Sequence, residues 1–135
     1  MKQKETIVVD VDDTLLALHP SLMGFANQRL GLNLTHDDYT DYDLSLVWGV
    51  RPNDASDLIQ EYYVSDWYQS GHPPIDEARY VLPLLKQKYR LVVATARPYW
   101  HRHRTESFLE NEFPGVFDTA YFISGHKADT NQLTT

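Results

Sequence analysis

The sequence predicts an α/β fold in which helices flank a parallel sheet and a helical segment is inserted after the first strand. Short apolar runs at residues 7–9, 91–94 and 119–123 are typical of buried strands, and segments with helical spacing separate them. Helix-linked strands favour parallel pairing with right-handed crossovers. The first connection is too long for a simple loop. Residues 20–71 are therefore expected to form a small helical cap, and residues 1–19 and 72–135 the α/β core.

Composition limits the classes of function. A chain of 135 residues with 42% hydrophobic content is large enough for one domain with a proper core. Its net charge of −7 argues against binding of long nucleic acid but leaves a small phosphorylated substrate possible. The absence of cysteine excludes disulfides, thiolate catalysis and Cys-ligated zinc. No apolar run reaches membrane-spanning length and no signal peptide is evident, so a cytoplasmic protein without a membrane partner is expected.

An acidic cluster directly follows the first predicted strand. Residues 7–9 predict a strand buried on both faces, and Asp10, Asp12 and Asp13 come after it. In open α/β sheets, ligands bind at this end of the strands. In an extended segment Asp10 and Asp12 lie on the same side, where they could hold Mg²⁺ or divide nucleophilic attack from proton transfer. The alternative is a strand that ends in an Asp-rich turn or helix cap.

The predicted cap contains two helices and an Asp-rich connection. Residues 21–30 have helical spacing, and Gly31 lies at the position of a C-cap glycine. Residues 33–46 lack the turn glycine and closing glutamate of an EF-hand, so helix capping and a solvated face are favoured over calcium binding. Residues 53–69 predict one continuous helix. Its apolar stripe favours a small core over stacking on a nucleobase, and it comprises Ala55, Leu58, Ile59, Tyr62, Tyr63 and Trp67.

After a break at residues 71–74, the core pattern resumes. Residues 75–89 predict a helix that Pro83 should kink or split. A helix is expected at about residues 99–112, in which His101 and His103 are two positions apart and therefore poorly placed to share a metal; solvated positive charge is favoured for this pair. The polar residues 128–135 are typical of the opening of a further helix.

Chemically matched groups follow each predicted strand. Asp10 and Asp12 follow the first, Thr95 the second and Lys127 the third. A phosphoryl group requires an oxygen-bound metal, hydroxyl and N–H donors, and a cation, and this set supplies them. Taken singly, Thr95 is also typical of a helix cap and Lys127 of a surface lysine.

These residues resemble the motifs of the haloacid dehalogenase (HAD) superfamily. The first motif matches Asp10-Val11-Asp12-Asp13-Thr14-Leu15 after an apolar strand. The second resembles Val92-Val93-Ala94-Thr95, and the third corresponds to Lys127. The resemblance covers essentially the whole chain in the expected order, and the first motif is the most specific.

The resemblance implies a Rossmann-like core and a role for each matched residue. Asp10 would be the nucleophile that forms an aspartyl-phosphate, and Asp12 would protonate the leaving oxygen and then activate water. Thr95 and Lys127 would hold the phosphate, with Lys127 also restraining the charge of Asp10. Mg²⁺ would be bound by the Asp10 carboxylate and the Asp12 backbone carbonyl.

Residues 35–46 and the Thr95-Ala96-Arg97-Pro98 turn look most like the 5'(3')-deoxyribonucleotidase branch of the superfamily. That branch implies dephosphorylation of nucleoside (deoxyribonucleoside) 5'-monophosphates, with cap aromatics near the base. For Arg97, two interpretations stay open: binding of substrate, or pairing with carboxylates of the cap.

The family's fourth, acidic motif should follow Lys127, and no such pair is present before the sequence ends at Thr135. A C-terminally incomplete chain is therefore expected, lacking the last helix–strand unit and leaving the strand before Asp10 with an unprotected edge. A homodimer is possible. Three competing interpretations remain. A phosphoacceptor receiver domain is disfavoured because residues 119–124 contain no Asp. The other two are a HAD phosphatase for another small metabolite and an inactive phosphate-binding domain.

Overall fold

The computed structural model describes residues 3–123 and the backbone of residues 129–132. The chain divides into two compact units. The first comprises Met1–Leu16 and Pro74–Thr135, and the second comprises Ala17–Pro73. The corresponding divisions were expected from the sequence between residues 19 and 20 and between residues 71 and 72. Within the described part of the chain, no helix is both long and apolar enough to cross a membrane.

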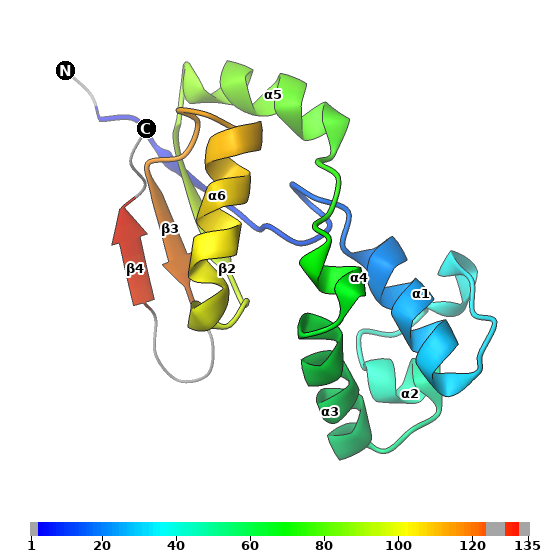
Figure 1. Ribbon diagram of the computed structural model, residues 1–135. Coiled ribbons are helices and arrows are strands. Elements are labelled where there is room, and N and C mark those ends of the chain that lie inside the picture. The colour runs from blue at the N-terminus through cyan, green and yellow to red at the C-terminus, as the bar shows by residue number, and fades with distance from the viewer. Residues whose placement is uncertain (1–2, 124–128, 133–135) are drawn as a thin grey trace. The chain divides into compact units, whose positions relative to one another are not determined.

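The first unit contains a four-stranded sheet with the order β1-β2-β3-β4. Its strands are β1 (Thr6–Val9), β2 (Arg90–Thr95), β3 (Thr119–Phe122) and β4 (Asp129–Gln132). The first three pair in parallel, with Val9 opposite Val93 and Thr95 opposite Phe122. Strand β4 runs antiparallel to β3, and the two arrows point in opposite directions in Figure 1. The carboxyl ends of β1, β2 and β3 therefore share one edge of the sheet.

Helices α5 (Asp76–Lys86) and α6 (Arg102–Glu112) accompany this sheet, and the 3-10 turn η2 (Tyr99–His101) leads into α6. The predicted α/β architecture, a parallel sheet with flanking helices, is confirmed. Pro83 does not split its helix as one alternative held, because α5 continues through it. Pro83 and Arg79, whose carbonyl loses its helical partner, are both exposed, so water can satisfy that carbonyl.

Two predictions about strands are wrong. Strand β1 is not buried on both faces, since Val8 is 63% exposed, and in the described sheet β1 pairs with β2 alone. An edge strand has a neighbouring strand on one side only, so fewer side chains pack beside its own. Residues 128–135 were expected to open a helix, yet Asp129–Gln132 form β4. The unpaired N–H and C=O groups along the outer edge of β3 offer a backbone partner that outweighs weak local helix preference.

The second unit consists of α1 (His19–Leu30), η1 (His36–Asp38), α2 (Leu44–Trp48), α3 (Pro52–Tyr63) and α4 (Asp66–Gln69). Its termini follow the capping expectations. Gly31 ends α1 with a φ of 66°, a conformation that glycine adopts without a steric penalty. Asp38 and Thr35 form a capping box, and the Asp43 carboxylate accepts the N–H of Ser45 to cap α2. Asp38 and Asp43 of this acidic segment are therefore cap groups.

The predicted single helix over residues 53–69 is wrong, because the chain breaks between α3 and α4. At the break, the Ser65 hydroxyl donates to the Tyr62 carbonyl at 2.6 Å, which competes with a continuing helix for that acceptor. The break changes the helical phase. Tyr68 is buried in place of the predicted Trp67, which is 40% exposed.

The aromatic residues at the centre of this unit form a core, as the favoured interpretation held. Tyr62 and Tyr68 are each 1% exposed, and their rings meet edge to face with centroids 5.5 Å apart. Around them pack the other buried residues of the cluster, which are Leu22, Phe25, Ala26, Trp48, Ala55 and Leu58. Buried rings of this kind stabilise the unit and are closed to a ligand.

Gly24 of α1 tests this packing. Replacing a glycine inside a helix with alanine normally stabilises by about 1 kcal/mol. A Cβ on Gly24, however, would lie 2.5 Å from Cζ3 of Trp67, whose Nε1 donates to Gln28 at 3.1 Å. We expect Gly24→Ala to lower the free energy of unfolding by about 1 kcal/mol, the scale of mild overpacking, and to raise it in a Trp67→Ala background. Urea unfolding of the four proteins measures this; stabilisation in both backgrounds would contradict the packing.

Candidate functional site

The acidic cluster lies on a tight turn that follows β1. The Val11 carbonyl accepts N–H groups from Thr14 at 3.2 Å and Leu15 at 2.9 Å, and the Asp13 N–H donates to the Leu16 carbonyl at 2.7 Å. Val11, Leu15 and Leu16 are buried, so apolar side chains hold the turn against the core. The extended alternation expected for Asp10 and Asp12 does not apply, because β1 ends at Val9 and the chain turns. The acidic side chains therefore lie on the part of the turn that these apolar residues leave exposed.

Asp10 is exposed at the carboxyl end of β1. One of its carboxylate oxygens, Oδ1, accepts the N–H of Val11 at 2.8 Å. This hydrogen bond orients the carboxylate while the residue stays accessible to solvent. Asp10 is thus an oriented, accessible carboxylate at the sheet edge where ligands bind in α/β folds.

Asp12 pairs with Arg97 of the turn after β2. Nη2 of Arg97 donates to Oδ1 of Asp12 at 2.7 Å, and Nε lies 3.2 Å from Oδ1 and 3.1 Å from Oδ2. The arginine side chain is 3% exposed and the aspartate side chain 26%. Neither interpretation left open for Arg97 anticipated this partner, since the carboxylate belongs to the first motif and not to the cap. A buried guanidinium needs such a partner because desolvating an unpaired charge is costly.

Two threonines complete the surroundings of Arg97. Nη1 of Arg97 donates to the Thr105 hydroxyl of α6 at 2.9 Å, and the Arg97 N–H donates to the Thr95 hydroxyl at 3.1 Å. Both threonines are buried. Thr95 therefore stabilises the turn after its strand. It does not cap the following 3-10 turn as its alternative interpretation held, because the N-cap of that turn is Pro98. Thr105 was not identified from the sequence, because a threonine inside a helix gives no signal there.

His101 is buried and not solvated as the sequence suggested. Burial, together with the positive charge of Arg97, lowers the pKa of His101 from 6.5 to about 4; Asp12 opposes this shift and Arg104 adds to it. The side chain is therefore neutral near pH 7. The expectation failed because spacing shows which sides of a helix two residues take, but not which side the core covers.

The structure brings three of the four predicted site residues to one edge of the sheet. Asp10 follows β1, whose last residue Val9 pairs with Val93, and Thr95 ends β2 two residues beyond that partner. Asp12 joins them through Arg97 and its contact with Thr95. Lys127 lies outside the described residues. Within residues 3–123, no group of three or more His, Cys, Asp or Glu is arranged to hold a metal ion.

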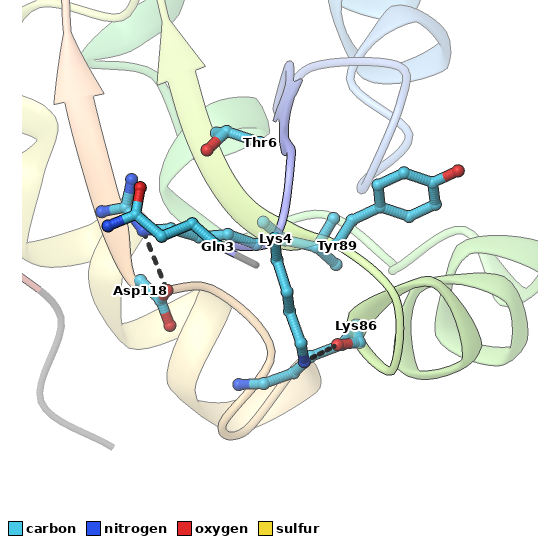
Figure 2. Close-up of a pocket in the computed structure, with 8 residues that line it drawn as sticks. Gln3, Lys4, Thr6, Lys86, Tyr89 and Asp118 are labelled. Atoms are coloured by element: carbon cyan, nitrogen blue, oxygen red, sulfur yellow. Dashed lines mark hydrogen bonds and ion pairs between the residues drawn. The ribbon is translucent and has the colours of Figure 1, made fainter. Parts of the chain in front are cut away.

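A cavity of about 550 Å³ lies elsewhere in the first unit. Figure 2 shows Lys4, Lys86 and Asp118 around it. It lies at the amino ends of β1 and β2, where Thr6 pairs with Arg90, and so opposite the edge that carries Asp10. Two of its cations already have partners. Nζ of Lys4 donates to the Lys86 carbonyl at 3.0 Å, and Nε of Arg90 donates to Oδ2 of Asp118 at 3.1 Å. We assign no catalytic chemistry to this cavity.

Comparison with known proteins places the fold. No protein-family profile matches this sequence. No curated protein matches it either. Among solved structures, this chain is similar to YfnB of Bacillus subtilis, which is assigned to the HAD hydrolases and was solved with magnesium bound. The two are 21% identical with a TM-score of 0.50, and the match covers 90% of this chain and 66% of YfnB. It is also similar to a HAD-superfamily hydrolase of subfamily IA from Geobacter sulfurreducens, at 15% identity and a TM-score of 0.50 over 87% of this chain and 61% of the other.

The chain has the HAD fold. The predicted fold class is confirmed, and the chain spans 66% and 61% of the lengths of these two structures. Residues 10–15, which match the first motif of the resemblance, form the turn after β1 that carries Asp10 and Asp12.

The buried His101 predicts a pH dependence of stability. Its pKa is about 4 in the folded protein and 6.5 as a free side chain, so between these values the unfolded chain binds more protons. Above pH 6.5 His101 is neutral in both states and does not lower the free energy of unfolding. As the pH falls from 6.5 toward 4, protonation of the unfolded chain lowers the free energy of unfolding by roughly 3 kcal/mol.

We expect His101→Gln to flatten the fall of unfolding free energy between pH 7 and pH 4, as measured by urea unfolding. The matched control is His103→Gln, which changes an exposed histidine two residues away. Carboxylates also titrate in this range, so only the difference between the variants is informative. An identical pH profile for His101→Gln and the original protein would contradict a neutral, buried His101.

Proposed function

We propose that this chain carries the catalytic edge of a Mg²⁺-dependent phosphatase that hydrolyses phosphomonoesters through an aspartyl-phosphate on Asp10. The observation that supports this most is the accessible, oriented carboxylate of Asp10 beside an Asp12 held by the buried Arg97. One carboxylate is open to a substrate and the other is held in place, which suits a division between attack and proton transfer.

The reaction proceeds in two balanced steps. Asp12, a carboxylate beside Arg97 in the free protein, takes up the proton that the phosphomonoester monoanion brings. A carboxylate oxygen of Asp10 then attacks phosphorus, the bond to the leaving oxygen breaks, and Asp12 gives the proton to that oxygen. Water then attacks the phosphorus of the acyl phosphate and passes a proton to Asp12, which releases inorganic phosphate and restores Asp10. The Thr95 hydroxyl oxygen accepts the N–H of Arg97, so its O–H can donate to a phosphate oxygen. Lys127 is assigned to the phosphate by the motif alone.

The donor set fits Mg²⁺, a hard cation that takes oxygen ligands and retains several waters. Both oxygens of the Asp12 carboxylate contact Arg97, so the Asp12 backbone carbonyl and the Asp10 carboxylate are the groups we assign to the ion. Such a site relies on water and substrate for its remaining ligands. When bound, the ion would neutralise charge on the phosphoryl oxygens.

We propose nucleoside 5'-monophosphates, in particular deoxyribonucleoside 5'-monophosphates, as the substrate class. The likeness of residues 35–46 and of the turn at residues 95–98 to the deoxyribonucleotidase branch supports this class. A cytoplasmic location, possible homodimerisation, and an absence of long nucleic acid and membrane partners belong to the same proposal.

The test is phosphate release from deoxynucleoside monophosphates, sugar phosphates and an aryl phosphate, with Mg²⁺ or with EDTA. It uses the longest natural chain that contains this sequence. We expect metal-dependent release that Asp10→Asn lowers by roughly 10³-fold or more, the scale of losing a covalent nucleophile. Asp13→Asn is the matched control, because it neutralises the neighbouring carboxylate on the same turn and should retain activity.

Faster release from deoxynucleotides than from sugar phosphates supports the substrate assignment, and the reverse order overturns that part alone. Two results contradict the phosphatase: no phosphate release from any substrate of the panel, or an Asp10→Asn protein as active as the original.

A further inference from the structure

A chain of three side chains connects α6 to the acidic turn. The Thr105 hydroxyl accepts Nη1–H of Arg97, and the opposite side of the same guanidinium donates through Nε and Nη2 to Asp12. Thr105 and Arg97 are buried, and Asp12 retains partial exposure. Because the guanidinium is planar, fixing one of its nitrogens on Thr105 also fixes the plane in which it meets the carboxylate.

We propose that Thr105 and Arg97 are positioning residues that orient Asp12 so that its Oδ2 carries the catalytic proton. This inference rests on the proposed phosphatase function and goes beyond it, since Thr105 belongs to none of the motifs that suggested that function and pairing with Asp12 was not among the roles considered for Arg97. Neither residue is expected to touch the substrate in this role; both act through Asp12.

The hydrogen bonds distinguish the two oxygens of Asp12. Oδ1 accepts from Nη2 at 2.7 Å and from Nε at 3.2 Å, whereas Oδ2 accepts only the Nε contact at 3.1 Å. A proton on Oδ1 would face two N–H donors, while one on Oδ2 leaves Oδ1 as the acceptor it already is. Oδ2 is therefore the atom that gives a proton to the leaving oxygen and receives one from water.

The same contacts explain why an arginine is used. The guanidinium offers Nε–H and Nη2–H to one carboxylate while Nη1–H reaches Thr105, so a single side chain spans from α6 to the acidic turn. An ammonium group has no such planar fork and would attract Asp12 without setting its orientation. The backbone of Arg97 is held as well, through its N–H and the Thr95 hydroxyl.

The test compares leaving groups. An aryl phosphate such as 4-nitrophenyl phosphate releases an anion that needs little protonation, whereas a deoxynucleoside monophosphate or a sugar phosphate releases an alcohol that needs a proton from Asp12. The value of kcat/KM covers steps up to departure of the leaving group. Misplacing Asp12 should therefore lower kcat/KM for alkyl phosphates more than for the aryl phosphate.

We expect Thr105→Val, which keeps the shape and removes the hydroxyl, to increase the ratio of aryl to alkyl kcat/KM about tenfold, a part of the typical contribution of general acid catalysis. Thr105→Ser, which retains a hydroxyl, should bring the ratio back. The matched control is Thr119→Val, which makes the same change at a buried threonine whose hydroxyl contacts Arg90, near the amino-end cavity. That control should leave the ratio as it was.

Arg97→Lys provides a second variant in case Thr105→Val folds poorly, and it should shift the ratio in the same direction. Equal losses on aryl and alkyl phosphates in both variants would overturn the positioning role and leave the phosphatase intact. If the original protein hydrolyses neither class of phosphate, the phosphatase fails, and this inference fails with it.

Discussion

The ion pair between Arg97 and Asp12 connects the elements on which the site depends. Arg97 is 3% exposed, so its charge must be compensated within the protein, and the Asp12 carboxylate at 2.7 Å provides that compensation. Through this pair the turn after β1, the turn after β2 and helix α6 meet at one guanidinium. Removing either partner would leave a buried or half-buried charge alone, which is far more costly than losing an exposed salt bridge. The site and the packing of this unit are therefore coupled.

Apolar packing determines which acids remain accessible. Val11, Leu15 and Leu16 are buried beneath the acidic turn, and their burial leaves the carboxylates at the surface of the unit. The two that matter then differ in surroundings: Asp10 stays exposed with one oxygen on a backbone N–H, and Asp12 is drawn to Arg97. Identical side chains two residues apart thus acquire different chemical character from their neighbours, which is how a pair of carboxylates divides labour.

Much of the fold follows from local pattern, and the failures have physical causes. The helix-linked parallel strands, the Gly31 helix end and the helix-capping role of residues 33–46 were predicted because each has a local sequence pattern. The break at Ser65 and the strand at Asp129–Gln132 were not, since a competing hydroxyl and a free strand edge override periodicity. For the site, Asp10, Asp12 and Thr95 were identified from motif and strand ends. The Arg97 partner and Thr105 required tertiary structure, because 85 residues separate Arg97 from Asp12.

The most direct test of the central claim is to trap the acyl phosphate. Protein quenched in acid during turnover of a phosphate ester is reduced with borohydride, which converts an aspartyl-phosphate to homoserine, and peptide mass spectrometry then locates the change. The account predicts homoserine at Asp10, only when substrate and Mg²⁺ were present. Homoserine at Asp12 or Asp13, or continued phosphate release with Asp10 unmodified, would contradict it.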